Sequence, residues 1–230
     1  NQSHVTTFLL PVQGSDHPIY NPSLDYSVYL SQPFFFVLFQ VLILLVTVYV
    51  VGSEIKFQTA DDWMAAADGN MVTAILGKLL PYTIIFILFG LLGNYVMFDI
   101  LHIPFHGNWG LIILITVLFI IATESLGLFI FSIFPAISLT ISIVSMVGSL
   151  GATLSGVTFP VPNMYPVVRG ASYLFPVRKY TEMMQIILYG GGGYVDIWTT
   201  ILVLCAFPLA SLMLLPRLKR AIESHKYEKL

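Results

Sequence analysis

The residue that most directly invites a chemical role is Glu124, an acid that lies inside a long apolar stretch of the chain. Placing a carboxylate in hydrocarbon is costly, so we expect Glu124 to face a cavity, to pair with a partner, or to hold a proton. Two interpretations stay open. Glu124 is a pathway or gating residue, or it makes a structural hydrogen bond to a Ser or Thr of the adjacent span, such as Ser138 or Ser142.

Other residues with catalytic or metal-binding potential form no recognisable site. His102 and His106 are four residues apart, as in a helical metal pair, but Pro104 between them interrupts a helix. The sequence contains no HExxH, GxSxG or P-loop motif. A single cysteine, Cys205, gives no disulfide framework. We therefore expect a chain that is not an enzyme, with no catalytic residue, no metal site and no cofactor of its own.

The composition of the chain indicates the class of protein in which these residues lie. The 230 residues are 57% hydrophobic and only 10% charged, with a mean hydropathy of +0.86, whereas soluble domains carry about 25% charged residues. The 12 acids and 10 bases also occur in clumps. This pattern excludes a soluble enzyme, a disordered chain and a nucleic-acid binder, whose phosphate contacts need clustered Lys and Arg. It indicates a polytopic membrane protein.

Five apolar stretches approach the length of about 20 residues that a membrane-spanning helix needs. They are residues 33–51, 79–98, 109–134, 136–159 and 197–215. We predict an all-α polytopic membrane protein with a transmembrane domain over residues 33–216. Residues 1–32 are then the end of an extracytoplasmic region whose upstream part is missing, and residues 217–230 form a cytoplasmic tail.

The basic residues predict the orientation. Five of the 10 bases follow the last apolar stretch, namely Arg217, Lys219, Arg220, Lys226 and Lys229. By the positive-inside rule this end is cytoplasmic. Because five spans place the two ends on opposite sides, the N-terminal end is extracytoplasmic, residues 52–78 are cytoplasmic, and residues 161–196 are outside.

The cytoplasmic segment 52–78 contains a short amphipathic stretch, DDWMAAADGN. Asp61 or Asp62 can cap a short helix there, and Trp63 and Met64 give it an apolar face. Either this is an ordinary interfacial helix anchored by its tryptophan, or it is a docking element for a cytoplasmic partner.

The outer segment 161–194 is cut by several prolines into short pieces. Helical spacing nevertheless places six of its residues on one apolar stripe: Val177, Tyr180, Met183, Met184, Ile187 and Leu188. We predict a pair of short helices that dip into the outer leaflet. In the preceding span, Gly148 with Ala152 and Gly151 with Ser155 allow close helix approach, either within the chain or between subunits.

Several short motifs occur in a fixed order along these elements. They are GSEIKFQT after the first span, the DDW helix, GKLLPY at the second span, then SGVTFPVPNM and LFPVRKY after the fourth. This order resembles the membrane permease subunits of type-2 ATP-binding-cassette (ABC) exporters, particularly the drug-export-like branch in bacteria. Gln58 departs from the pattern, because a glycine is expected before Thr59, and this puts the tight turn there in doubt.

The resemblance implies a six-span permease of the bacterial inner membrane, surrounded by lipid and paired with a second permease as a homo- or heterodimer. ABC-type ATPase subunits would bind ATP and Mg and drive export. The residues that match the family's ATPase-coupling segment are Glu54, Thr59, Asp61, Asp62, Trp63, Asp68 and Lys78. Those that match its re-entrant exit segment are Pro160, Met164, Pro166, Pro176 and Arg178.

Two functions from other classes stay open beside an ATP-driven exporter. A secondary transporter or channel would use Glu124 as an ion-coupling group, and a membrane scaffold would have no transport activity. The scarcity of charges inside the spans favours a conduit that a partner drives.

Overall fold

The structure is a computed structural model that describes residues 26–103, 107–157, 159, 161–190 and 194–224. Within these ranges every regular element is a helix. The α-helices, in chain order, are α2 (Tyr26–Lys56), α3 (Ala60–Ala66), α4 (Met71–Tyr95), α5 (Trp109–Ile133), α6 (Ile137–Leu154), α7 (Pro166–Ser172), α8 (Pro176–Gln185) and α9 (Tyr194–Glu223). Short π- or 3-10-helical segments cover Val96–Ile100, Val161–Asn163 and Ile186–Gly190.

Five helices of the described chain are long and apolar enough to cross a membrane, which confirms the predicted all-α polytopic fold. They cover Leu30–Lys56, Met71–Ile100, Trp109–Ile133, Ile137–Leu154 and Ile197–Glu223. The boundaries differ from the predicted ones. The second span begins at Met71 because the Asn70 side chain caps it, accepting from the backbone N–H groups of Val72 and Thr73 at 3.0 and 3.4 Å.

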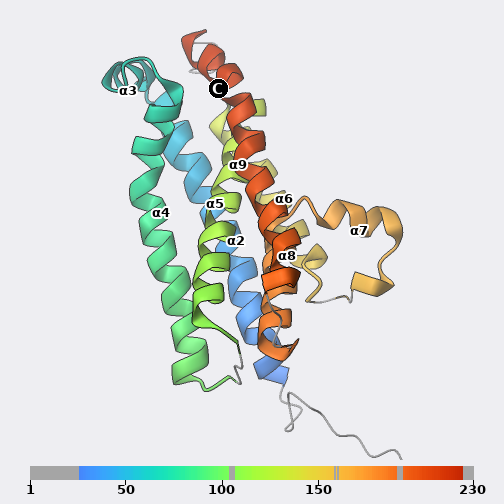
Figure 1. Cartoon of the computed structure of the whole chain (residues 1–230). Coiled ribbons are helices and arrows are strands. Elements are labelled where there is room, and N and C mark those ends of the chain that lie inside the picture. Colours follow the sequence, from blue (N-terminus) through green and yellow to red (C-terminus); the bar gives the residue numbers. More distant parts are fainter. Residues whose placement is uncertain (1–25, 104–106, 158, 160, 191–193, 225–230) are drawn as a thin grey trace, which may run out of the picture.

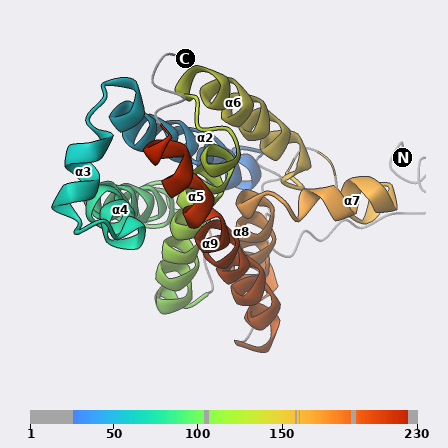
Figure 2. The same cartoon turned by 90° about the horizontal axis from the view of Figure 1, so that it is seen from above.

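Helix α5 is the centre of the bundle (Figures 1 and 2). It packs most extensively against α9 and α2, and it also contacts α4, α6 and α8. Most apolar side chains of α4 and α9 are exposed or half-buried, and Leu88 and Leu202 are among the exposed ones. Apolar side chains on the outside of a membrane bundle face lipid. Helix α7 projects sideways from the bundle in both views.

The apolar stripe predicted for residues 177–188 is confirmed. All six of its side chains are at most 4% exposed, and they form part of one core cluster with residues of α2 and α5. The rings of Phe36 and Phe119 pack against the Tyr180 ring at tilts of 34° and 41°, with centroids 4.2 and 4.8 Å away. Helix α8 is therefore packed inside the bundle and not on its surface.

The small residues of α6 serve packing within the chain. A Cβ atom added at Gly148 would lie 2.7 Å from Cγ2 of Val41, and one added at Gly151 would lie 2.6 Å from Nε2 of Gln40. Larger side chains at these positions would push α6 away from α2. The intrachain interpretation of these glycines is therefore correct.

Helix α3 and the C-terminal end of α9 lie at the same end of the bundle (Figure 1). The Lys219 ammonium donates a 2.7 Å hydrogen bond to the backbone oxygen of Gly69, in the turn between α3 and α4. The predicted topology needs these two segments on one side of the membrane, and the structure places them together.

Candidate functional site

A cluster of polar contacts joins the end of α2, the turn before α3 and the first part of α4. The Glu54 carboxylate accepts a hydrogen bond from the Thr59 hydroxyl and forms an ion pair with Lys78 of α4. The Thr59 backbone N–H also donates to the Glu54 backbone oxygen at 3.0 Å. One side chain at the end of α2 thus holds both the turn before α3 and the first part of α4.

The tight turn before Thr59 does form, so the doubt raised by Gln58 is resolved. Gln58 adopts a φ of 59°, in the left-handed region that favours glycine. For an L-residue this conformation costs about 1–2 kcal/mol. The hydrogen bonds from Thr59 to Glu54 compensate for that cost. Here glutamine takes a conformation for which glycine was expected.

Trp63 joins α3 to α4. Its indole N–H donates a 3.2 Å hydrogen bond to the backbone oxygen of Ala74, and the Lys78 ammonium lies 5.6 Å from the centroid of its ring. Lys78 therefore contacts Glu54 of α2 and Trp63 of α3 from its position on α4. A shallow cavity of about 370 Å³ lies beside Trp63 and Lys78 in the angle between α3 and α4.

The aspartates of this segment lie differently from the prediction. Neither Asp61 nor Asp62 caps α3, because the N-cap residue is Thr59, whose own side chain bonds to Glu54. Asp61 and Asp62 instead occupy the first turn of α3, where an acid stabilises the positive end of the helix dipole. Asp68 lies in the turn after α3 with a φ of 52°. All three side chains are exposed at this end of the bundle.

Glu124 faces a second feature, a cavity of about 380 Å³ between α4, α5 and α9. Its side chain is only 6% exposed. The Thr83 hydroxyl of α4 lies within hydrogen-bonding distance of both carboxylate oxygens, at 3.0 and 2.8 Å. The partner is therefore a threonine of an adjacent span, as the structural interpretation expected, but the two serines named as examples are wrong. Ser138 and Ser142 are exposed on α6, and the Ser142 hydroxyl donates to the Ser138 backbone oxygen.

The bundle also holds a buried polar network, away from α3, that was not predicted from the sequence. The Asn94 amide donates to Thr116 at 3.1 Å and to the Tyr180 hydroxyl at 3.3 Å, and the Gln32 amide donates to the same hydroxyl at 3.2 Å. These four side chains come from α4, α5, α8 and α2, and each is at most 1% exposed. Single polar residues in apolar spans are the only signal that could have found them.

Gln40, the one strongly polar residue of the predicted first span, supports α8. Its Oε1 atom accepts a 2.9 Å hydrogen bond from the Val177 backbone N–H, in the first turn of α8. Gln40 lies ten residues into the span that begins at Leu30, or about 15 Å along a helix that rises about 1.5 Å per residue. Helix α8 thus begins well inside the bundle, as a re-entrant helix does.

The candidate exit residues occupy this region. Pro166 and Pro176 are the first residues of α7 and α8, where proline is favoured because no helical N–H is lost. Met164 is buried, and Arg178 is 4% exposed. Pro166 and Arg178 line one cavity. Pro160 lies outside the described residues.

Comparison with known proteins places this architecture in a family. A sequence model of the ABC-2 family transporter proteins matches residues 1–215. The chain is 29% identical over 136 residues to a probable multidrug ABC transporter permease, YbhS, of Escherichia coli strain K12, and equally to that of E. coli O157:H7. The aligned part is 57% of this chain and 35% of each relative, so the match spans about a third of these relatives' length. The family match covers nearly the whole sequence and agrees with the five-span bundle, and the chain therefore belongs to the ABC-2 family of transporter proteins.

Proposed function

We propose that this chain is the permease part of an ATP-driven exporter in the bacterial inner membrane. It pairs with a second permease, and α3 docks on a cytoplasmic ATPase that binds ATP and Mg. The C-terminus is cytoplasmic, and the N-terminal end of the chain is extracytoplasmic. Membership of the ABC-2 family supports the transport role.

The observation that carries the proposal is the contact of Lys78 with two other elements. Lys78 pairs with Glu54 at the end of α2 and lies over the Trp63 ring of α3. A force applied to α3 therefore reaches α2 and α4 through side chains that are already in contact. An interfacial helix that served only as an anchor would not need ties to both neighbouring spans.

The charge pattern of this end supports the docking role and the orientation. Exposed acids lie at both ends of α3, with Asp61 and Asp62 in its first turn and Asp68 in the turn after it. The basic residues Arg217, Lys219 and Arg220 lie on the last turns of α9 at the same end. Basic residues next to a span favour the cytoplasmic side.

The test compares Trp63→Ala with Trp198→Ala. Trp198 is a tryptophan of α9 that is 64% exposed and so controls for loss of an indole at the membrane. Both variants should insert into the membrane. Only Trp63→Ala should abolish the stimulation of ATP hydrolysis by the permease, measured with the P-loop ATPase that co-purifies with the chain.

A second variant separates loss of docking from loss of folding. Asp62→Lys changes the exposed face of α3 without removing the Trp63 contacts, and it should weaken ATPase binding while the permease still inserts. Full stimulation by both variants would show that α3 is not the coupling element. Transport by the purified chain alone under an ion gradient would favour the secondary transporter instead.

A further inference from the structure

A cavity of about 780 Å³ opens between the end of α6 and the helices α7 and α8. Its lining includes Ser155, Gly156, Arg169, Tyr173, Arg178 and Glu182. The volume lies within the range of about 300–1,000 Å³ that is usual for small-ligand sites. The α3 segment lies at one end of the bundle, whereas α7, which borders this cavity, projects from the bundle nearer its middle (Figure 1).

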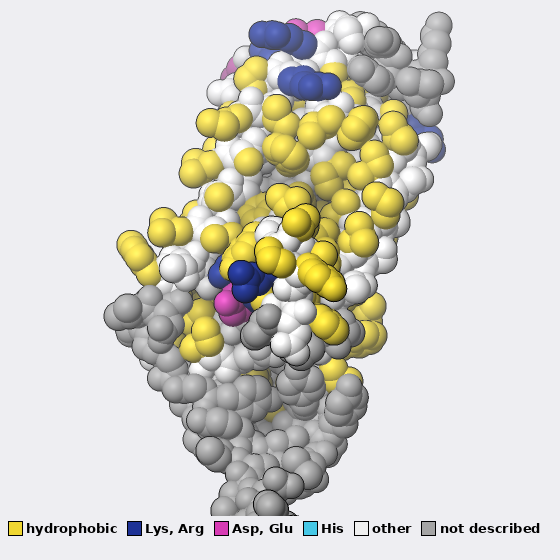
Figure 3. Space-filling model, turned by 90° about the vertical axis from the view of Figure 1, so that its right-hand side faces the viewer, with side chains coloured by type: hydrophobic (Ala, Val, Ile, Leu, Met, Phe, Trp, Pro, Cys, Tyr) yellow, Lys and Arg dark blue, Asp and Glu magenta, His cyan; other side chains and the backbone are white. Residues whose placement is uncertain are grey.

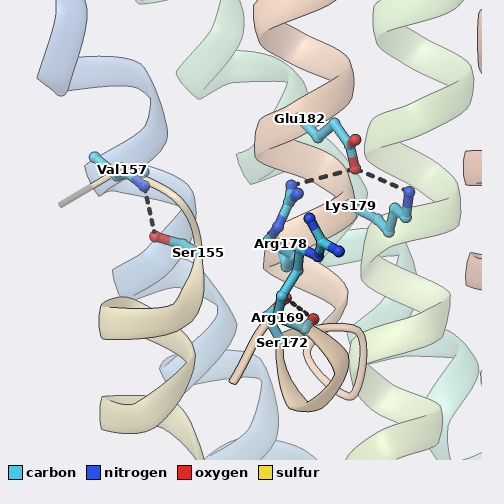
Figure 4. A network of polar contacts seen from close by, with 7 residues as sticks. All are labelled: Ser155, Val157, Arg169, Ser172, Arg178, Lys179 and Glu182. Atoms are coloured by element: carbon cyan, nitrogen blue, oxygen red, sulfur yellow. Dashed lines mark hydrogen bonds and ion pairs between the residues drawn. The ribbon is translucent and has the colours of Figure 1, made fainter. Parts of the chain in front are cut away.

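The cavity and its border carry excess positive charge. Glu182 accepts from Arg178 Nη1 at 3.2 Å and from Lys179 Nζ at 2.8 Å. The Arg169 side chain lies beside that of Arg178 (Figure 4). Two of these cations pair with Glu182 and Arg169 lies beside them, so the described residues of this cluster carry two net positive charges.

Arg178 is the residue that most needs a further partner. The side chain is 4% exposed, and its Nε atom has no hydrogen-bond partner among the described residues. A buried donor without an acceptor costs about 1–3 kcal/mol. Arg178 also lines the cavity together with Arg169, so an anion held there would pair with both guanidinium groups.

The surroundings of the cluster are apolar. Figure 3 shows basic and acidic side chains gathered on this face and surrounded by hydrophobic ones. Tyr165 and Val167, at the start of α7, are 82% and 83% exposed, and Leu174 between α7 and α8 is 66% exposed. An anion that reaches these cations from the membrane side would bring its own apolar part, for which these side chains provide a contact surface.

We propose that this cavity binds the phosphate group of an anionic membrane phospholipid, with Arg178 and Arg169 as ligands of the phosphate. The acyl chains then lie against the exposed apolar side chains of α7. Basic pockets between membrane helices bind lipid headgroups by the same chemistry. This inference goes beyond the proposed function, because binding needs neither an ATPase nor ATP.

The experiment measures lipids retained by the purified full chain in native mass spectrometry. The probes are phosphatidylglycerol and phosphatidylcholine with identical acyl chains, and inorganic phosphate is a separate competitor. The wild-type chain should retain phosphatidylglycerol in preference to phosphatidylcholine. Arg178→Gln and Arg169→Gln should each weaken that retention roughly tenfold, the effect of losing one charge-assisted hydrogen bond.

Two comparisons make the result decisive. Arg220→Gln removes the same charge from the C-terminal end of α9, away from this cavity, and should leave this retention unchanged. Arg169 is exposed, so its substitution tests the site even where Arg178→Gln fails to fold. Equal retention of both lipids, or wild-type retention by Arg169→Gln, would overturn the proposal. Binding of inorganic phosphate without phosphatidylglycerol would assign the cations to a soluble anion and would also overturn it.

Discussion

The Oε1 atom of Gln40 accepts a 2.9 Å hydrogen bond from the backbone N–H of Val177, which is 137 residues away in the sequence. Gln40 lies within the first span and Val177 in the first turn of α8, and both are fully buried. The N–H groups in the first turn of a helix have no partner within that helix. In an apolar environment such a group must find an acceptor elsewhere, and Gln40 provides it.

This contact gives a prediction for the stability of α8. Gln40→Met keeps the length of the side chain but removes the acceptor, which should cost about 1–3 kcal/mol because the Val177 N–H stays buried. The melting temperature of the purified chain should fall by several degrees. Limited proteolysis should also cut the segment between α6 and α9 faster.

The control for this variant is Leu42→Met. Leu42 lies two residues after Gln40 on the same helix, and its side chain is half exposed. It should leave the melting temperature and the cleavage rate unchanged. If Gln40→Met is as stable as the wild-type chain, the hydrogen bond to Val177 does not hold α8 in place.

The turn before α3 gives a second prediction. Gln58→Gly should stabilise the chain by about 0.5–1 kcal/mol, because glycine adopts the positive φ of this position without steric cost. Gln58→Val should destabilise it, since a β-branched residue is a poor fit to this conformation. Hydrogen exchange of the Thr59 N–H, which donates to the Glu54 backbone oxygen, should slow in the first variant and accelerate in the second. The opposite order would show that the turn does not have this backbone conformation.

The five spans, the short helices α7 and α8, and the apolar stripe of α8 could be predicted from the sequence because each depends on local length or spacing. The length of an apolar run indicates a span. The recurrence of apolar residues every three to four positions indicates a helix with one buried face. Val177, Tyr180 and Met183 follow that spacing and are all fully buried.

The partners of the buried polar residues could not be predicted in the same way. In a membrane, side chains that face lipid are as apolar as those that face the core, so the sequence of a span does not indicate how the helix is rotated. In α4, Phe86 is buried and Leu88 is exposed, although both are large and hydrophobic. Because the sequence does not indicate how the helices are rotated, it does not indicate that Thr83, and not Ser138 or Ser142, is the partner of Glu124.

The contact between Glu124 and Thr83 gives the third prediction. A glutamine has the shape of a glutamate and can both donate and accept, so Glu124→Gln should keep the hydrogen bond to Thr83. Its melting temperature should match that of the wild-type chain. Glu124→Ala should lower the melting temperature, because it enlarges the cavity of about 380 Å³ and removes the hydrogen bond that joins α5 to α4, leaving the Thr83 hydroxyl only the Leu79 backbone oxygen.

The same pair of variants separates the two interpretations of Glu124. An exporter driven by an ATPase does not need an ionisable group at this position, so we expect Glu124→Gln to keep both transport and the stimulation of ATP hydrolysis. Ser142→Ala, which alters a serine on α6 that does not contact Glu124, serves as a control and should change neither stability nor transport. If Glu124→Gln is stable but inactive in transport, Glu124 acts through its charge or its proton. Transport would then include an ion-coupled step, either in addition to the step that the ATPase drives or in its place.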